Sequence, residues 1–422
     1  MPYLPGRALR CALPLIGAVA VLLGGGAPRA TAEDMRARQW YLDAMQADDM
    51  WKVSRGEGVT VAVLDTGVDS SVPELNGQVL PGTDVSNKPK GANEDENGHG
   101  TNMAAMIAGR DVGEGIQGLA PGAKILPVRT AGDPTADADD PLWARAIRYA
   151  ADHGARVINI SMAGPAEAGQ APLTASAVKY ALEKGSLIFA GSGNDGDEVN
   201  FPHYPAALPG VVSVGAVDRS GTVTKWSNSA SNVALAASGA EIPGRCTKSK
   251  GFCAGDGTSQ ATAVVSASAA LIWSKHPDWT NNQVLRVMMD TAGKPTTGKV
   301  PSIYIGYGIV RPRKVLVDGE GNPGPADVNP LLAAAEKDAK PSTAPSPKAK
   351  NDAKAPTPEE KAAESRDSGN STLWIGIGAG AAVVAAVAAT VFVRRRKRAA
   401  AAPNPYAPTP SPPYGPGPGP GQ

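Results

Sequence analysis

The sequence predicts an α/β domain with a mostly parallel β-sheet and helices on both of its faces, followed by one transmembrane helix near the C-terminus. Two observations support this prediction. Apolar runs typical of buried strands alternate with helical patterns between residues 59 and 317, and an unbroken uncharged apolar run covers residues 373–393. The chain has 422 residues and a formal net charge of +1, which is enough length for one sizeable core and gives no basic excess that would indicate nucleic-acid binding.

The first residues, 1–32, have the features of a secretory signal peptide. Basic residues precede an apolar run at 12–23, and an A-T-A cleavage site ends at Ala32. The apolar run is too short to cross a membrane as a helix. We therefore expect cleavage after Ala32, and an N-terminal extension at 33–58 ahead of the domain.

The predicted strands are short apolar runs at 61–64, 125–129, 157–160, 187–190 and 211–214. Helical patterns occur between them, for example at 141–153 and 173–184. Ligands and reacting groups of such parallel sheets lie outside the carboxyl ends of the strands. We therefore expect the functional residues in the segments that follow these runs.

Three glycine-flanked motifs contain the residue types of a nucleophilic triad. Asp65 follows the first strand in D-T-G-V, His99 lies in G-H-G-T, and Ser259 lies in G-T-S-Q-A-T. A hydroxyl is a poor nucleophile at neutral pH, so Ser259 needs a base, and an imidazole that titrates near neutrality suits that role. A buried carboxylate then fixes the tautomer of the imidazole and offsets the charge that it gains. Each motif alone is common, but the combination predicts nucleophilic catalysis.

A glycine-rich turn after the 187–190 run presents Asn194 in G-S-G-N-D-G. Asn is common in such turns because it tolerates left-handed backbone angles. Its amide can also donate to the oxyanion of a tetrahedral intermediate, together with the backbone N–H of Ser259 at a helix start. The sequence leaves both interpretations open.

Secretion also decides how the cysteines are interpreted. Cys11 lies in the predicted signal peptide, so Cys246 and Cys253 are the only thiols of the mature chain. Such a pair in an oxidising compartment favours a disulfide that closes a short loop ahead of Ser259. The alternative is two buried, unpaired thiols.

The motifs resemble those of the subtilases, the subtilisin-like serine proteases, over roughly residues 40–316. The resemblance implies a three-layer subtilisin-like fold at 59–317 and an endopeptidase that acts on peptide or protein substrates without a cofactor. It assigns the acid to Asp65, the base to His99, the nucleophile to Ser259 and the oxyanion amide to Asn194. The segment V-I-N-I-S-M-A-G resembles the strand that pairs with an extended peptide, so substrate contacts are expected at Ser161, Met162, Ala163 and Gly164.

Two positions depart from the family pattern. Asn102 follows G-H-G-T where a small residue or His is usual, and Ala263 replaces the proline expected in the first turns of the serine helix. Because Ala is a good helix former, the second change need not alter the backbone. Neither departure removes a triad residue.

Acidic residues gather in two stretches, Glu94 to Glu96 and a second one made of Asp133, Asp137, Asp139 and Asp140. Neither has the Gly and Glu spacing of a helix-loop-helix calcium site, so we expect solvated loops and no metal. By family position the second stretch flanks the bound peptide. This suggests a preference for basic substrate residues.

The C-terminal part is expected to anchor the protein. Residues 318–371 are rich in Pro, Ala, Lys and Glu and are predicted to be a disordered linker. The run at 373–393 is long enough to span a bilayer, and the basic cluster that starts the segment 394–422 predicts a cytoplasmic tail. We therefore expect a single-pass protein of the cell membrane whose catalytic domain lies outside.

The whole architecture is similar to that of the mycosins, membrane proteases associated with type VII secretion in actinobacteria. The segments 39–51 and 307–312 resemble the N-terminal segment and the domain end of that group. Little chain separates the predicted cleavage site from the domain, so autoprocessing of a long pro-domain is not expected. The resemblance implies a type VII membrane complex as partner. The alternatives are a structural subunit whose catalysis is dispensable, and a general surface protease.

Overall fold

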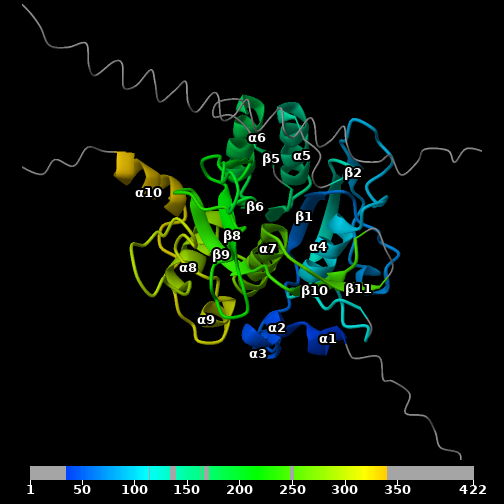
Figure 1. Cartoon of the computed structure of the whole chain (residues 1–422), viewed down its shortest axis with the longest axis horizontal. Coiled ribbons are helices and arrows are strands. Elements are labelled where there is room, and N and C mark those ends of the chain that lie inside the picture. The colour runs from blue at the N-terminus through cyan, green and yellow to red at the C-terminus, as the bar shows by residue number, and fades with distance from the viewer. Residues whose placement is uncertain are drawn as a thin grey trace, which may run out of the picture. The chain divides into compact units, whose positions relative to one another are not determined.

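A seven-stranded β-sheet lies at the centre of the folded domain (Figure 1). The structure is a computed structural model and describes residues 35–113, 115–133, 139–162, 164–165, 171–247 and 251–339. The predicted signal peptide at 1–32, Ala163, the linker from 340, the span at 373–393 and the tail at 394–422 lie outside these residues. Within the described ranges, none of the helices has the length and apolar character needed to cross a bilayer.

The prediction of a mostly parallel sheet is confirmed, and the central sheet is parallel throughout. Its strands follow the order β2 (Thr83–Asp84), β3 (Lys124–Arg129), β1 (Thr60–Asp65), β4 (Val157–Ile160), β6 (Leu187–Gly191), β8 (Val212–Val217) and β9 (Val233–Ser238). Five of them coincide with the predicted runs. Two antiparallel pairs stand apart, β5 (Gly164–Pro165) with β7 (His203–Tyr204), and β10 (Ile242–Arg245) with β11 (Phe252–Gly255).

Helices cover both faces of this sheet. Those that contact its strands are α4 (His99–Ala108), α5 (Asp140–Asp152), α6 (Pro172–Glu183), α7 (Thr258–Lys275) and α8 (Asn281–Thr291). The other helices are α1 (Met35–Arg38), α2 (Trp40–Ala44), α3 (Ala47–Trp51), the 3₁₀ helix η1 (Pro73–Leu75), α9 (Pro312–Leu316) and α10 (Pro330–Ala339). The patterns at 141–153 and 173–184 are confirmed as α5 and α6, each displaced by one residue.

Alternate side chains of the central strand β1 enter two different cores. Val61 and Val63 belong to the core shared with α4 and α7, whereas Ala62 and Leu64 belong to the core shared with α5 and α6. A strand buried on both faces needs an unbroken apolar run, because successive side chains point in opposite directions. The same strand delivers Asp65 at its carboxyl end.

Helix α7 passes through the larger core. Its residues from Thr258 to Trp273 are all buried, and many of them are Ala, Ser or Val. Small side chains allow a fully buried helix to lie close to the strands on one side and to α4 on the other. Ala263 is one of these buried residues, so the helix continues through the position where proline was expected.

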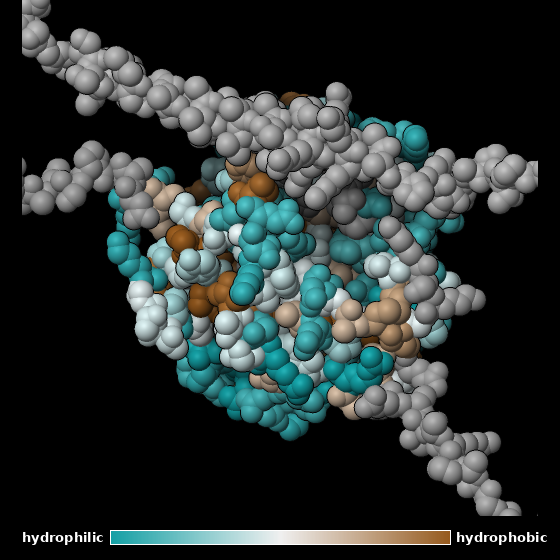
Figure 2. Space-filling view, viewed as in Figure 1, coloured by the Kyte–Doolittle hydropathy of each residue, from teal (hydrophilic) through white to brown (hydrophobic). Residues whose placement is uncertain are grey.

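The N-terminal extension belongs to the folded domain. Tyr41, Leu42 and Met50 are fully buried in the larger core, and the indole of Trp51 donates to the carbonyl oxygen of Leu119 at 2.8 Å. Figure 2 shows hydrophilic residues along the lower edge of this face, where α2 and α3 lie in Figure 1. The extension therefore adds apolar area to the core and leaves a polar outer surface.

The expectation of a disordered linker from residue 318 is wrong for residues 318–339. Arg286 of α8 donates to the carbonyl oxygens of Pro323 at 3.0 Å and of Val328 at 2.7 Å, and α10 follows. Thr280 donates to the carbonyl oxygen of Ala326. The composition suggested too little apolar surface for folding, but hydrogen bonds to the main chain of this segment hold it against α8.

Candidate active site

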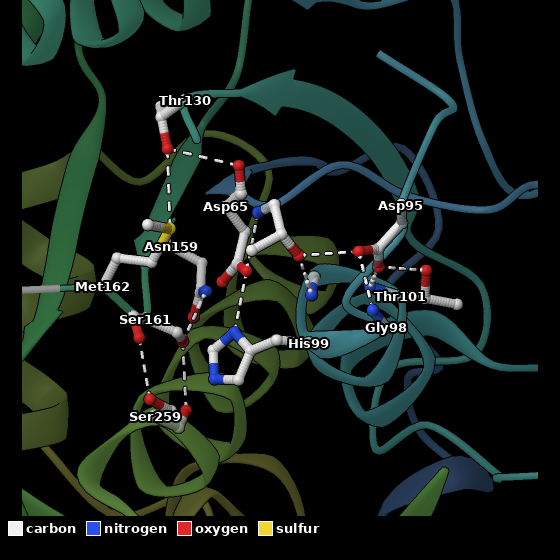
Figure 3. A network of polar contacts seen from close by, with 12 residues as sticks. Asp65, Asp95, Gly98, His99, Thr101, Thr130, Asn159, Ser161, Met162 and Ser259 are labelled. Carbon is white, nitrogen blue, oxygen red and sulfur yellow. Dashed lines mark hydrogen bonds and ion pairs between the residues drawn. The ribbon is translucent and has the colours of Figure 1, made fainter. Parts of the chain in front are cut away.

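The predicted triad residues come from three elements and meet at one cavity of about 730 Å³. Asp65 ends β1, His99 begins α4 and Ser259 lies in the first turn of α7. In Figure 3 the imidazole of His99 lies between the carboxylate of Asp65 and the side chain of Ser259. His99 and Ser259 both line the cavity, together with Ser161 and Asn194.

Asp65 and His99 form a close pair. The Nδ1 atom of His99 lies 2.7 Å from Oδ1 of Asp65, which is fully buried and also accepts from the backbone N–H of Thr66 at 2.8 Å. This contact fixes the tautomer of the ring, because Nδ1–H must donate to the carboxylate. The other ring nitrogen is then available as a base.

The glycines of the G-H-G motif allow this close approach. Gly98 has a φ of +87°, a left-handed conformation that favours glycine, and directly precedes α4. A Cβ atom on Gly100 would lie 2.2 Å from the carbonyl oxygen of Gly67 and 3.0 Å from Cβ of Asp65. A side chain at this position would push α4, and with it His99, away from β1.

The surroundings of His99 change its basicity. Burial alone lowers the pKa of the imidazole, but the charge of Asp65 and the hydrogen bond to it, with weaker contributions from Asp95 and Asp133, outweigh that effect. The pKa of His99 is therefore above its ordinary value. A base with a raised pKa takes a proton from a hydroxyl more readily.

The hydroxyl of Ser259 is held by the main chain in this structure. Its Oγ donates to the carbonyl oxygen of Ser161 at 2.7 Å, and Oγ of Ser161 donates to the carbonyl oxygen of Ser259 at 3.1 Å. A change of one staggered χ1 rotamer turns the hydroxyl away from Ser161. Transfer of the hydroxyl proton to a base would require the hydroxyl to leave this contact with Ser161.

Asn194 is oriented by the start of α7. Its Oδ1 accepts from the backbone N–H of Thr258 at 2.8 Å and from the hydroxyl of Thr258 at 3.0 Å. With the amide oxygen engaged there, the NH₂ group is the free end of the side chain at the cavity. The left-handed interpretation of Asn194 is wrong, because the positive φ of this turn, +117°, belongs to Gly193.

The segment after β4 lies beside Ser259, but its side chains differ in role. Ser161 and Gly164 line the cavity. Met162 is 2 % exposed, and its sulfur atom accepts from the hydroxyl of Thr130 at 3.5 Å, so this side chain packs inside the domain. Substrate contact at Met162 can therefore involve only its main chain.

Cys246 and Cys253 form a disulfide, so the alternative of two unpaired thiols is wrong. The bond crosses the hairpin of β10 and β11, and both cysteines line the cavity. The hairpin is thus a wall of the cavity. It leads directly into the motif that carries Ser259.

Three residues that join this hairpin to α4 and to η1 were not predicted as a group from the sequence. The backbone N–H of Arg245 donates to Oδ1 of Asn102 at 3.0 Å, one helical turn after His99. The guanidinium of Arg245 binds both carboxylate oxygens of the fully buried Glu74 at 2.6 Å. The departure at Asn102 therefore has a structural role. Glu74 and Arg245 are separated by 171 residues, and no local pattern links them.

Arg245→Met is expected to lower the free energy of unfolding by about 3 kcal/mol, because it leaves the carboxylate of Glu74 buried and unpaired. Urea unfolding of the purified protein measures this loss. The double variant Glu74→Leu/Arg245→Met should recover much of it, since the buried charge is gone. Lys52→Met, which removes an exposed ion pair with Asp49, is the control and should change stability by less than about 1 kcal/mol. Equal losses in the Arg245 and Lys52 variants would contradict this account.

Several acidic residues expected in solvated loops have specific partners. Asp95 accepts from the backbone N–H groups of Gly98 and Thr101, both at 2.8 Å, and so holds the start of α4. Asp139 caps α5, and Asp140 accepts from Thr174 near the start of α6. Carboxylates at helix starts are stabilised by free N–H groups. The solvated-loop expectation is wrong for Asp140, which lies in α5, and for the partly buried Asp95, whereas Asp139 is exposed.

The suggested preference for basic substrate residues changes accordingly. Of the second acidic stretch, Asp133 lines the cavity, and Asp137 lies outside the described residues. The basic preference stays a prediction that now depends on Asp133. Among the described residues, no group of three or more His, Cys, Asp or Glu side chains is arranged to hold a metal ion.

Comparison with known proteins agrees with this geometry. The profile of the subtilase family matches residues 56–308. The cell wall-associated protease of Bacillus subtilis (strain 168) is 36% identical over 290 residues, which are 66% of this chain and 31% of that protein. Subtilisin E of the same organism is 34% identical over 257 residues, 60% of this chain and 65% of that protein. The chain thus spans less than two thirds of the length of these two relatives.

Solved structures of mycosins are also similar. MycP1 with its N-terminal propeptide removed has 31% identity and a TM-score of 0.60, covering 68% of this chain and 99% of that one. MycP3, described as a protease from the type VII (ESX-3) secretion system, has 33% identity and a TM-score of 0.56. This match covers 66% of the present chain and 87% of the MycP3 chain. The family match spans the segment that contains β1, α4 and the start of α7, where Asp65, His99 and Ser259 meet. The chain belongs to the subtilase family of serine peptidases.

Proposed function

We propose that this chain is an endopeptidase that hydrolyses peptide bonds with Ser259 as nucleophile, His99 as general base and Asp65 as the group that orients it. The observation that carries the proposal is the 2.7 Å contact between Asp65 and His99 at the cavity that Ser259 lines. A serine that only caps a helix does not need a buried carboxylate and an imidazole beside it.

The proposed reaction has two halves. Oγ of Ser259 attacks the substrate carbonyl carbon while His99 takes the hydroxyl proton, and His99 then gives this proton to the leaving nitrogen as the C–N bond breaks. A water molecule then attacks the carbonyl carbon of the resulting ester while the same imidazole takes its proton. His99 gives this proton to Oγ of Ser259 as the C–O bond breaks, and the acid is released. Asp65 stays ionised and stabilises the imidazolium in both halves.

The oxyanion of each tetrahedral intermediate is proposed to bind between the NH₂ group of Asn194 and the backbone N–H of Ser259. The first N–H groups of α7 have no acceptor within the helix, and the helix dipole favours negative charge there. The contact of Asn194 with Thr258 supports this role, because it holds the amide oxygen away from the reacting atoms.

Asn194→Ala is expected to reduce kcat by about 10²–10³-fold with little change in KM, because the lost donor acts on charge that exists only in the transition state. This magnitude is measured on subtilisin and is taken over from it. Steady-state hydrolysis of a fluorogenic peptide gives both constants. Asn232→Ala serves as control. It removes a different asparagine, whose side-chain amide donates to the carbonyl oxygen of Ala206. A KM effect without a kcat effect would argue against the assignment.

The extended substrate is proposed to pair with the main chain at 161–164, as the family resemblance implies. Anchorage in the membrane by the run at 373–393 and association with a type VII secretion complex are part of the same proposal. They are supported by the uncharged run with its basic flank and by the similarity to MycP1 and MycP3.

One experiment tests activity and anchorage together. Membranes of cells that make the full chain are treated with a fluorophosphonate probe, which reacts with an activated serine, and are then extracted with alkaline carbonate. We expect a labelled band that stays in the membrane pellet, and no label on the Ser259→Ala variant. An unlabelled wild-type chain would refute the catalytic proposal, and a labelled chain in the carbonate supernatant would refute the anchor alone.

A further inference from the structure

Gln260, the residue after Ser259, presents an unpaired amide oxygen at the active-site cavity. The residue is 7 % exposed and lines the cavity, and its Oε1 is buried with no hydrogen-bond partner among the described residues. A buried polar atom without a partner costs about 1–3 kcal/mol. At the wall of a substrate cavity, such an acceptor can gain its donor from a ligand.

The backbone around Gln260 leaves room for this amide. A Cβ atom on Gly257 would lie 2.7 Å from Oε1, and one on Gly255 would lie 2.9 Å from Nε2. These glycines lie at the start of α7 and the end of β11, on the hairpin side of the cavity. The amide thus lies in a recess that side chains at either position would fill.

Ser259 and Gln260 point to different sides of the cavity. The hydroxyl of Ser259 faces Ser161, the start of the segment proposed to bind the acyl half of the substrate. Consecutive residues of a helix differ by about 100° in direction, and Gln260 faces the hairpin instead. An extended peptide continues in one direction through the cavity, so we place its leaving half on the side away from Ser161, where the hairpin residues line the cavity.

We propose that Gln260 selects the first residue of the leaving half. Its Oε1 accepts a hydrogen bond from a hydroxyl or amide in the side chain of that residue, so Thr, Ser and Asn are preferred over Val, Ala and Leu. A site built around a buried polar group rejects an analogue that lacks the matching donor, because the group is then left unpaired. This inference rests on the proposed peptidase function and adds the substrate chemistry of one subsite.

The test is a cleavage profile of the purified protein on a peptide library, with cut sites identified by mass spectrometry. For the wild type we expect Thr to be about tenfold preferred over its isostere Val directly after the cut. Gln260→Met keeps the size of the side chain and removes the acceptor, so this preference should disappear while the preference before the cut is unchanged. Gln260→Glu should shift the preference toward Lys and Arg. Gln46→Met, the same change at an exposed position, should leave the profile as in the wild type.

The outcomes separate this inference from the proposed function. Equal preference for Thr over Val in the wild type and in Gln260→Met, or no preference in either, overturns the role of Gln260 and leaves the triad untouched. If Gln260→Met still reacts with the fluorophosphonate probe but cuts no peptide, the proposal that Gln260 acts only in this subsite is also overturned. A wild-type protein that neither reacts with the probe nor cuts any peptide overturns the catalytic proposal, and this inference with it.

Discussion

Ser259→Ala is expected to lower the rate of peptide hydrolysis by about 10⁶-fold while the domain stays folded. The size of this loss is measured on the subtilisin triad and is taken over from it. Without the hydroxyl no covalent intermediate can form, and His99 has no serine hydroxyl to deprotonate. The fold should tolerate the change, because Oγ of Ser259 makes one hydrogen bond, to Ser161, and both partners lie at the cavity.

Single-turnover and steady-state hydrolysis of a fluorogenic peptide measure this loss, and thermal unfolding shows that the variant is folded. Ser176→Ala, an exposed serine on α6, is the control and should keep full activity. A residual rate within tenfold of the wild type would mean that another group is the nucleophile.

The same variant separates catalysis from scaffolding in cells. Secretion is compared in a strain without the chain and in a strain that carries Ser259→Ala. If catalysis is required, the variant behaves like the deletion. Full restoration of secretion by the variant would instead favour the alternative of a structural subunit in a membrane complex, and this outcome would leave the chemistry of the triad intact.

Asp65→Asn is expected to lower kcat by about 10⁴-fold and to move the acidic limb of the kcat/KM profile to lower pH. His99 accepts a proton only when neutral, and its raised pKa means that neutral imidazole predominates only at higher pH. Removal of the carboxylate charge removes the main contribution that raises this pKa. An amide at this position also fails to fix the ring tautomer, which accounts for the loss of rate.

Initial rates across the pH range, with enough enzyme to follow the slow variant, give both effects. Asp111→Asn removes an exposed carboxylate that has no part in the shift and should leave the profile unchanged. A limb that stays in place in Asp65→Asn, or moves to higher pH, would show that Asp65 does not control the protonation of His99.

The residues that meet at the cavity could be predicted from the sequence because Asp65, His99 and Ser259 each lie in a short local pattern. An apolar run buried on both faces ends at Asp65. Two glycines flank His99, one in a left-handed conformation and one where a side chain has no room, and a glycine also precedes Thr258 and Ser259. Local patterns also predicted the parallel sheet and the helices α5 and α6. The domain boundaries were harder to predict, because residues 318–339 are held by hydrogen bonds to α8 that composition does not reveal.

The sequence by itself determined the class of fold, the order of the three proposed catalytic residues and the cysteine pair near Ser259. Only the tertiary structure decided how these groups are held and how they are oriented. The buried pair of Glu74 and Arg245, the contact of Asn102 with the hairpin and the unpaired oxygen of Gln260 depend on segments distant in the chain or on the direction of one side chain. The spacing of apolar residues along the chain indicates which face of a strand or helix is buried, so these elements can be predicted locally. Which atoms then meet across the core depends on how those elements pack, and that is a property of the whole domain.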